Sequence, residues 1–351
     1  MPCFPDEAFL KNKMKKTKIV VTVGPASESV EILEKLLREG MNIMRLNFSH
    51  GDVAEHQARL DNFRTAQKNT GIAGEVLQDL SGPKIRLGDF AEGEVLLIAG
   101  QNIIITTEQI VGDVHRVSVN YPQFPREVKV GEAVMLDDGR KKLQVERIDG
   151  EEVTCTVVVG GNIKNRRGVN LPDSKLSVKA LTEKDMKDLE FGVTNAVDYV
   201  ALSFVREASD IVELRDALHA RGSTTKIIAK IETPQAIANI DAIISAVDGA
   251  MVARGDLGIE EPYEKVPMFQ KMIIKKCNEA GKFVITATQM LESMVENPTP
   301  TRAEVSDIAD AILEGTDALM LSEETALGAH PVEAVQVMTR VALEVEGEMR
   351  G

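Results

Sequence analysis

The sequence has no tryptophan, few other aromatic residues and only three cysteines. Aromatic residues make up 4% of the 351 positions. That is too few to expect the exposed rings on which single-stranded nucleic acids stack. Cys3, Cys155 and Cys277 lie far apart and in no metal-ligand spacing. An odd, sparse set of thiols is typical of a reducing compartment rather than of a disulfide-stapled fold.

Long apolar runs and an excess of positive charge are missing as well. No segment reaches the length that a membrane-spanning helix needs, and residues 1–18 lack the apolar stretch and cleavage site of a signal peptide. We therefore expect a cytoplasmic protein without a membrane partner. The net charge of −14, from 41 Lys and Arg against 55 Asp and Glu, argues against a nucleic-acid partner. A local basic pocket for phosphate remains compatible with it.

What the sequence does contain is an alternation of short apolar runs and amphipathic helical segments. One helical segment has Ser27 or Ser29 as its candidate N-cap and Gly40 after its end. Continuous apolar strands that alternate with helices are typical of a parallel sheet covered on both faces. Eight units in roughly 250 residues fit an α/β fold, the TIM (β/α)8 barrel. The expected strands are 19–23, 42–48, 74–78, 199–204, 226–231, 250–253, 283–287 and 318–321.

The pattern changes between the third and fourth of these runs. Residues 83–176 show short strands with turn signals and no helical periodicity, which indicates a small all-β barrel domain inserted after strand three. Residues 1–82 and 177–351 then form the catalytic barrel. Asp137, Asp138 and Gly139 are interpreted as a tight hairpin turn, with a functional role as the less favoured alternative.

Polar and charged residues follow most of the predicted barrel strands, where a TIM barrel carries its functional side chains. This order favours an enzyme. The residues are Arg45, Asn47, Ser49, His50, Asp79, Ser203, Arg206, Lys230, Glu232, Arg254, Asp256, Thr288, Gln289, Ser322, Glu323 and Glu324.

Two pairs among these residues suggest a chemistry. Arg45 and Lys230 suit an anionic substrate. Glu232 and Asp256 suit a divalent cation such as Mg²⁺, which takes few carboxylates together with water and phosphate oxygens. Lys230 and Glu232 are two apart, so their side chains point to the same side of an extended strand. The alternative reading of this pair is a structural salt bridge at the barrel mouth.

Nine segments, in order along nearly the whole chain, carry a family resemblance. They are TVGPAS (22–27), MNIMRLNFSHG (41–51), QDLSGPKIR (78–86), RRGVNLP (166–172), IIAKIET (227–233), MVARGDLGIE (251–260), TATQMLESM (286–294), PTRAEVSDIADAILEG (300–315) and MLSEETALG (320–328). By these motifs the chain resembles the pyruvate kinases. The resemblance implies phosphoryl transfer between phosphoenolpyruvate and ADP, which gives pyruvate and ATP as the last step of glycolysis.

The resemblance also assigns roles at the phosphoryl-transfer centre. It implies that Lys230 stabilises the phosphoryl group in flight, as suits a loose transition state, and that Arg45 grips the phosphate. It places the catalytic Mg²⁺ on Glu232 and Asp256, with Mn²⁺ as a possible substitute. The amides of Gly255 and Asp256 and the Thr288 hydroxyl would hold the substrate carboxylate. Thr288 and Ser322 lie where the family delivers a proton to the enolate.

The nucleotide side follows from the same resemblance. Contacts to ADP or ATP map to Asn47, Phe48, Ser49, His50 and Arg86, and to the inserted domain near Arg166, Arg167 and Asn170. A second Mg²⁺ is expected to arrive with ADP. The inserted domain resembles the family's mobile lid, which closes over the nucleotide and excludes water.

A monovalent-cation pocket departs from the commoner family pattern. Potassium-dependent members usually have Thr at position 80 and Glu at position 84, where this chain has Leu80 and Lys84. The other pocket residues, Asn47, Ser49 and Asp79, are retained. We expect that the fixed ammonium of Lys84 takes the place of K⁺, so that K⁺ is not required.

Two further departures concern position 323 and the length of the chain. Many members have a small residue where Glu323 stands, which leaves the role of Ser322 open. Family members usually continue into a C-terminal α/β domain that binds sugar-phosphate effectors. The expectation here is that this domain and its allostery are absent and that a homo-dimer is favoured over a tetramer. The alternative functions are a metal-dependent aldolase or mutase acting on pyruvate enolates, and a non-enzymatic scaffold.

Overall fold

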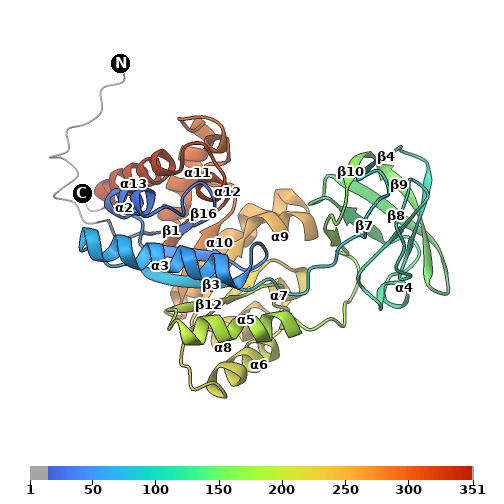
Figure 1. Ribbon diagram of the computed structural model, residues 1–351, viewed down its shortest axis with the longest axis horizontal. Coiled ribbons are helices and arrows are strands. Elements are labelled where there is room, and N and C mark those ends of the chain that lie inside the picture. The colour runs from blue at the N-terminus through green and yellow to red at the C-terminus, as the bar shows by residue number, and fades with distance from the viewer. Residues whose placement is uncertain (1–14, 350–351) are drawn as a thin grey trace.

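The computed structural model describes residues 15–349, which form a closed barrel and a separate all-β unit (Figure 1). The barrel has eight parallel strands in the order β1-β16-β15-β14-β13-β12-β3-β2, which confirms the predicted fold class. Seven of the expected runs agree with the strands to within one residue. The run 199–204 ends earlier, because Phe204 adopts a left-handed φ of 55° and turns the chain. The strands are β1 (Lys18–Thr22), β2 (Ile43–Asn47), β3 (Glu75–Asp79), β12 (Tyr199–Leu202), β13 (Lys226–Ile231), β14 (Gly249–Ala253), β15 (Phe283–Ala287) and β16 (Ala318–Leu321).

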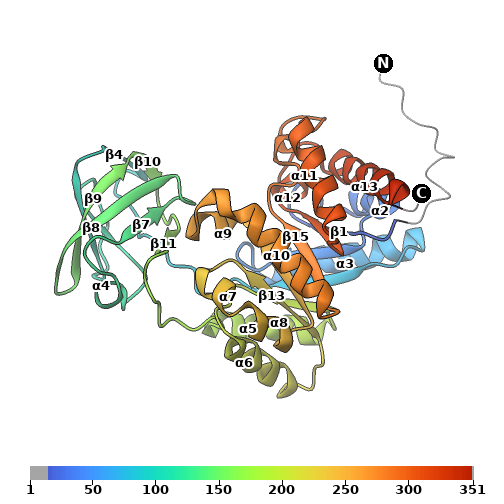
Figure 2. The same cartoon turned by 180° about the vertical axis from the view of Figure 1, so that it is seen from behind.

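Helices surround the barrel on its outer face (Figures 1 and 2). They are α2 (Val30–Glu39), α3 (Val53–Thr70), α5 (Glu183–Thr194), α6 (Ala208–His219), α7 (Pro234–Ala238), α8 (Ile240–Ala246), α10 (Val266–Glu279), α11 (Arg302–Leu313) and α13 (Pro331–Glu348). Short helical segments follow some strands: α9 (Arg254–Glu260), η1 (Tyr263–Lys265), η2 (Glu292–Val295) and α12 (Glu323–Ala326).

Local sequence signals fix several helix ends. Of the two candidate caps of α2, Ser29 is the one whose side chain accepts from an amide of the helix, that of Ile32, and Gly40 ends the helix with a φ of 112°. The Ser27 hydroxyl accepts from the amide of Gly24 instead. Capping boxes begin α3 at Asp52, α5 at Thr182 and α11 at Thr301. Each cap satisfies amides that the first helical turn leaves without a partner.

The inserted unit has its own hydrophobic core, separate from the core between the barrel strands and the helices. It contains a six-stranded sheet in the order β11-β7-β8-β9-β5-β6 and a two-stranded sheet of β10 and β4. One turn of helix, α4 (Phe124–Glu127), interrupts the otherwise all-β pattern. The strands are β4 (Glu94–Leu97), β5 (Asn102–Thr106), β6 (Arg116–Ser118), β7 (Ala133–Leu136), β8 (Lys141–Asp149), β9 (Glu152–Val159), β10 (Gly161–Lys164) and β11 (Val169–Asn170).

The two chain segments that connect the barrel to the inserted unit pair with each other. The amide of Val169 donates to the carbonyl of Ile85 at 2.9 Å, and Arg86 and Gly168 form an antiparallel bridge. At the start of this neck, Gly82 has a φ of 64°, and a Cβ there would lie 2.8 Å from the Cβ of Ser203. The neck therefore leaves the barrel against the turn that follows β12.

Two findings bear on the cysteines and on membranes. Cys155 and Cys277 are buried, and burial raises the pKa of both thiols to about 12, so neither is a reactive nucleophile. Cys3 lies outside the described residues. Within residues 15–349, no helix combines the length and apolar character that crossing a bilayer requires.

Candidate active site

A cleft of about 1460 Å³ opens at the mouth of the barrel, where the strands end, and extends toward the inserted unit. In both views α9 lies between the barrel and the inserted unit (Figures 1 and 2). Some of the predicted site residues line this cleft: Arg45, Asn47, His50, Lys84, Arg254, Gly255, Asp256, Thr288, Gln289, Ser322 and Glu323. Asp79, Lys230 and Glu232 do not line it but lie buried or nearly so behind it.

The cleft residue Arg45 belongs to a buried network of charges around Asp79, at the end of β3. The Arg45 guanidinium binds Asp79 Oδ2 through Nε at 2.8 Å and through a terminal nitrogen at 2.7 Å, and it donates to Thr22 Oγ1 at 2.9 Å. Lys230 Nζ lies 3.5 Å from Asp79 Oδ1. Burial opposes the charge of this carboxyl, but Lys230 and Arg45 outweigh it and lower the pKa of Asp79. Asp79 therefore stays ionised.

Lys230 projects from β13 into the same network. Its Nζ donates to Ser203 Oγ at 2.7 Å, and the Ser203 hydroxyl donates in turn to the carbonyl of Leu80. Nζ also lies 3.5 Å from Glu232 Oε2, so the alternation of the strand places both side chains together, and the ion pair of the alternative reading is present. Burial opposes the charge, but Asp79 and Glu232 raise the pKa of Lys230 above its ordinary value. The result is a cationic ammonium in the buried network that Arg45 joins.

Glu232 is fully buried and only half satisfied. Its Oε1 accepts from the amide of Phe204 at 2.7 Å, an amide that the left-handed φ of this residue turns toward it. Its Oε2 is buried without a hydrogen-bond partner. Burial is the main cause that raises the pKa of Glu232 to about 7; Lys230 opposes this shift and Asp256 adds to it.

These observations fit a divalent cation at Glu232. A buried carboxylate oxygen that accepts no hydrogen bond is free to bind a metal ion. Asp256, in the first turn of α9, also lines the cleft, and its carboxylate accepts no hydrogen bond within residues 15–349. The described residues hold no group of three His, Cys, Asp or Glu side chains arranged for a metal. A site with two carboxylates suits Mg²⁺, which keeps waters and binds substrate oxygens.

Thr288 follows β15 in a strained turn. Thr288 and Gln289 have φ of 72° and 56°, in the left-handed region that side chains avoid. Arg254 holds this turn by donating to the carbonyls of Ala287 and Thr288, at 3.2 and 2.6 Å. Thr288 Oγ1 accepts from the amide of Gly255 at 2.8 Å. Two of the groups expected to bind the substrate carboxylate are therefore bonded to each other here.

The residues after β16 divide into one structural carboxylate and two cleft residues. Glu324 is fully buried and accepts from the amides of Leu291 and Ser322, at 3.2 and 2.7 Å, so it ties two loops together. Ser322 and Glu323 line the cleft. Glu323 thus stands beside Ser322 at the mouth of the barrel.

The loop after β2 carries the predicted nucleotide contacts. Asn47 Oδ1 accepts from the amide of Ser49 at 3.1 Å. His50 lies at the cleft wall, where partial burial and then the charges of Lys84 and Arg86 lower the pKa of its imidazole. Phe48 points away from the cleft, since it is buried and stacks on the ring of His56 at 4.1 Å.

The predicted cation-pocket residues do not all gather at one point. Leu80 is fully buried in the hydrophobic core and presents no side-chain oxygen. Lys84 lines the cleft, and its ammonium makes no hydrogen bond or ion pair within residues 15–349. The oxygens of Asp79 face Arg45 and Lys230.

The predicted arginines of the inserted unit lie around its neck. Arg86 donates to the carbonyl of Arg166 at 3.1 Å, and Arg166 forms a bidentate pair with Asp89. Arg167 lies 3.4 Å from Asp137, in the β7–β8 turn.

That turn reaches the cleft, and the hairpin predicted for it from the sequence is present. Asp138 and Arg140 line the cleft, and a Cβ on Gly139 would contact Ile259 of α9 at 3.5 Å. Asp137 and Asp138 both have φ of 54°, as a tight hairpin turn requires. The turn is therefore both a hairpin and a wall of the cleft.

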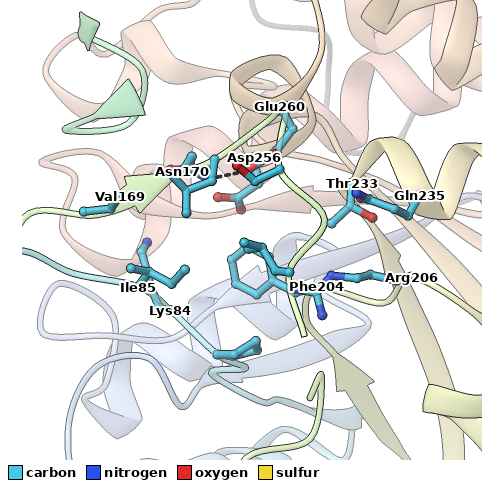
Figure 3. A pocket seen from close by; sticks show the side chains of 14 residues that line it. Lys84, Ile85, Val169, Asn170, Phe204, Arg206, Thr233, Gln235, Asp256 and Glu260 are labelled. Atoms are coloured by element: carbon cyan, nitrogen blue, oxygen red, sulfur yellow. Dashed lines mark hydrogen bonds between the residues drawn. The ribbon is translucent and has the colours of Figure 1, made fainter. Parts of the chain in front are cut away.

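A small pocket of about 30 Å³ lies under the neck, and Figure 3 shows the side chains around it. Asn170 of β11 donates to Glu260 of α9 at 2.7 Å, the dashed line in the figure. Burial is the main cause that raises the pKa of Glu260 to about 7. Sequence reasoning missed Glu260, because nothing local links it to a residue 90 positions earlier.

Comparison with known proteins gives these residues a family context. A family model described as "Pyruvate kinase, barrel domain" matches residues 14–335. The chain is 51% identical over 335 residues to "Pyruvate kinase" of Geobacillus stearothermophilus and 49% identical over 336 residues to that of Bacillus licheniformis; each comparison covers 95% of this chain and 57% of the relative. It is 46% identical over 338 residues to that of Clostridium perfringens, covering 96% of this chain and 71% of the relative. The chain thus spans little more than half the length of the first relatives.

Proposed function

Because the chain belongs to the pyruvate kinase family, we propose that it transfers the phosphoryl group of phosphoenolpyruvate to ADP, giving pyruvate and ATP. The observation that carries this proposal is the buried ammonium of Lys230, fixed by Ser203 and Asp79 beside the orphaned oxygen of Glu232. A fixed cation next to a divalent-metal ligand suits a phosphoryl group that crosses between two oxygens.

In the proposed reaction the P–O bond to the enol oxygen breaks and a P–O bond to the β-phosphate of ADP forms. The electron pair of the broken bond stays on the enolate oxygen. Lys230 and Arg45 would hold the phosphoryl oxygens, since both are cationic and share Asp79, and Arg45 lines the cleft. Asp79 keeps both in place through its two oxygens. Neither cation has to reorganise during transfer, which is the main electrostatic advantage of a preorganised site.

The enolate then takes a proton at carbon 3 to become pyruvate. We assign delivery of this proton to the hydroxyls of Thr288 and Ser322, which both line the cleft. The substrate carboxylate would bind at the amides of Gly255 and Asp256 and at Thr288. The Gly255 amide is then released from Thr288 Oγ1, which it bonds in the structure.

The proposed cofactor is Mg²⁺ held by Glu232 and Asp256, with a second Mg²⁺ bound to ADP; Mn²⁺ suits the same oxygen ligands. The chemistry that Mg²⁺ supplies there is neutralisation of charge on the enolate and phosphoryl oxygens. Asn47, Ser49, His50, Arg86 and Arg167 are proposed to contact the nucleotide. The inserted unit, residues 83–176, would close over it.

We propose further that the reaction needs no K⁺. The support comes from the two positions at which this chain differs from potassium-dependent members of the family. The Leu80 side chain lies in the core, and the Lys84 ammonium lines the cleft without a partner among the described residues. A positive charge is therefore already available on the chain.

The test is a coupled assay for pyruvate from phosphoenolpyruvate and MgADP, with Lys230→Met beside the wild type. We expect pyruvate from the wild type and a loss of kcat of at least about a hundredfold in the variant. Lys226→Met is the matched control, because Lys226 lies exposed at the other end of β13. The proposal fails if the wild type makes no pyruvate. If it instead consumes pyruvate with an aldehyde and without ATP, the aldolase reading replaces it.

A further inference from the structure

The loop that follows β2 is held from behind by two helices. It runs from Asn47 to Gly51, and its polar side chains Asn47 and His50 line the cleft. Its amides are bonded within the barrel: Phe48 N–H donates to the carbonyl of Asp79 at 2.9 Å, and Ser49 N–H to Asn47 Oδ1. The carbonyls of Phe48 and His50 are bonded on the opposite side, by groups outside the predicted site.

His56, in the first turns of α3, binds the carbonyl of His50. Its Nε2 lies 3.0 Å from that oxygen, and its ring is 1% exposed. Burial is the main cause that lowers the pKa of His56 to about 4, so the ring is neutral at physiological pH. A neutral ring has one N–H, which must be on Nε2 for this bond to form. The other nitrogen, Nδ1, is buried without a partner.

The same ring also supports Phe48. The rings of His56 and Phe48 stack with centroids 4.1 Å apart and planes at 17°, and Phe191 of α5 packs at an angle against Phe48. His56 thus contacts the loop twice, by stacking at Phe48 and by a hydrogen bond at His50.

Lys184, in the first turn of α5, binds the other carbonyl. Its Nζ donates to the carbonyl of Phe48 at 2.9 Å and also binds the carboxylate of Asp188 on the same helix. Asp188 is itself largely buried, so the ammonium is aimed from the helix to the loop. The two loop carbonyls are therefore fixed by two donors from different helices.

We propose that His56 and Lys184 are positioning residues that set the loop Asn47–Gly51 for a nucleoside diphosphate. The inference rests on the proposed function, because it takes ADP as the ligand of this loop. With both carbonyls bonded at the back, the side chains of Asn47 and His50 remain at the cleft. Neither positioning residue touches the phosphoryl-transfer centre, so their effect falls on ADP rather than on phosphoenolpyruvate.

Two single variants separate the contributions. His56→Phe keeps a ring for Phe48 and removes the donor to His50, and Lys184→Met keeps the aliphatic stem and removes the ammonium. For each we expect the KM for ADP to rise about fivefold, the loss of about one hydrogen bond. The kcat and the KM for phosphoenolpyruvate stay within about twofold. His56→Gln restores the donor and is expected to return the KM for ADP to near the wild-type value.

The controls are substitutions of the same type away from the loop. One control is His219→Gln, because His219 is exposed at the end of α6. The other is Lys187→Met, because Lys187 is exposed on α5. Neither should change the KM for either substrate. Circular dichroism establishes that each variant is folded, and if His56→Phe does not fold, Lys184→Met and His56→Gln carry the test.

Calorimetric titration of the full chain with MgADP supplies a readout that does not depend on turnover. Weaker MgADP binding in His56→Phe and Lys184→Met supports the inference even if the wild type makes no pyruvate, an outcome that would reject only the proposed function. The inference is overturned if the wild type is active and both variants keep the KM for ADP, or if both substrates are affected equally.

Discussion

Replacing Asp79 by asparagine removes one buried negative charge that two buried cations share. Asp79 is 1% exposed, and its partners Arg45 and Lys230 have side chains only 8% and 12% exposed. Breaking a buried ion pair by removing one partner typically costs about 3 to 5 kcal/mol, because the remaining charge stays buried without compensation. We expect Asp79→Asn to lower the free energy of unfolding by about 3 kcal/mol, the lower end of this range, since the asparagine carbonyl can still accept one bond from Arg45.

The matched control is Asp89→Asn, which removes an aspartate that likewise binds an arginine, Arg166, through two nitrogens. This second pair lies on the surface, with side chains 74% and 40% exposed for Arg166 and Asp89. Solvent screens such a pair, so we expect no measurable change in stability. Urea unfolding followed by far-UV circular dichroism gives both free energies. An Asp79→Asn protein as stable as Asp89→Asn would refute the reasoning.

The pH dependence of the same unfolding free energies tests whether Asp79 is ionised in the folded protein. The folded pKa of Asp79 is lowered below its ordinary value of 3.8. Its contribution is therefore fully present above that value and is lost as the pH falls below it toward the folded pKa. The stability difference between wild type and Asp79→Asn should shrink as the pH falls below about 4. A difference that grows in acid would contradict the assignment of Asp79 as the ionised partner.

Three more changes test other parts of the site. Glu232, with its pKa raised to about 7, must lose a proton to bind a metal, so the affinity for Mn²⁺ should fall as the pH drops below about 7. Calorimetry in buffers of different ionisation heat should detect the released proton. Glu232→Gln should abolish both effects. In a K⁺-free assay, added K⁺ should raise the wild-type rate less than about twofold, whereas Lys84→Glu should make the rate depend on K⁺ or abolish it. Gly82→Ala places a Cβ 2.8 Å from Ser203 at a φ of 64°, so urea unfolding should show a loss of about 2 kcal/mol; an unchanged midpoint would show that the neck adapts.

The barrel was predictable because its signal is local. Each strand is a short apolar run, several helices begin at a capping residue such as Ser29 or Thr301, and eight repeats reinforce one another. The pairing of Lys230 with Glu232 was predictable for the same reason, since alternation along a strand fixes which side chains share a face.

What escaped prediction depends on contacts between distant segments. Phe204 continues an apolar run, yet its left-handed backbone ends β12 and turns its amide toward Glu232. Asp138 belongs to a turn that any hairpin could use, and only the placement of the inserted unit brings it to the cleft. His56 looks like an ordinary helical histidine until the loop after β2 folds back on it. Sequence periodicity contains none of these relations.

The paired neck between the two units also bears on how the chain folds. In the barrel, β12 hydrogen-bonds directly to β3, with Tyr199 beside Leu77, although the whole inserted unit lies between them in the chain. In an unfolded chain this pairing has to close a long loop, and the entropic cost rises with loop length. Once the inserted unit has formed its own core, Ile85 and Val169 are held side by side. Pairing β12 with β3 then closes only the segments 80–85 and 169–198, which include α5, rather than the whole insertion.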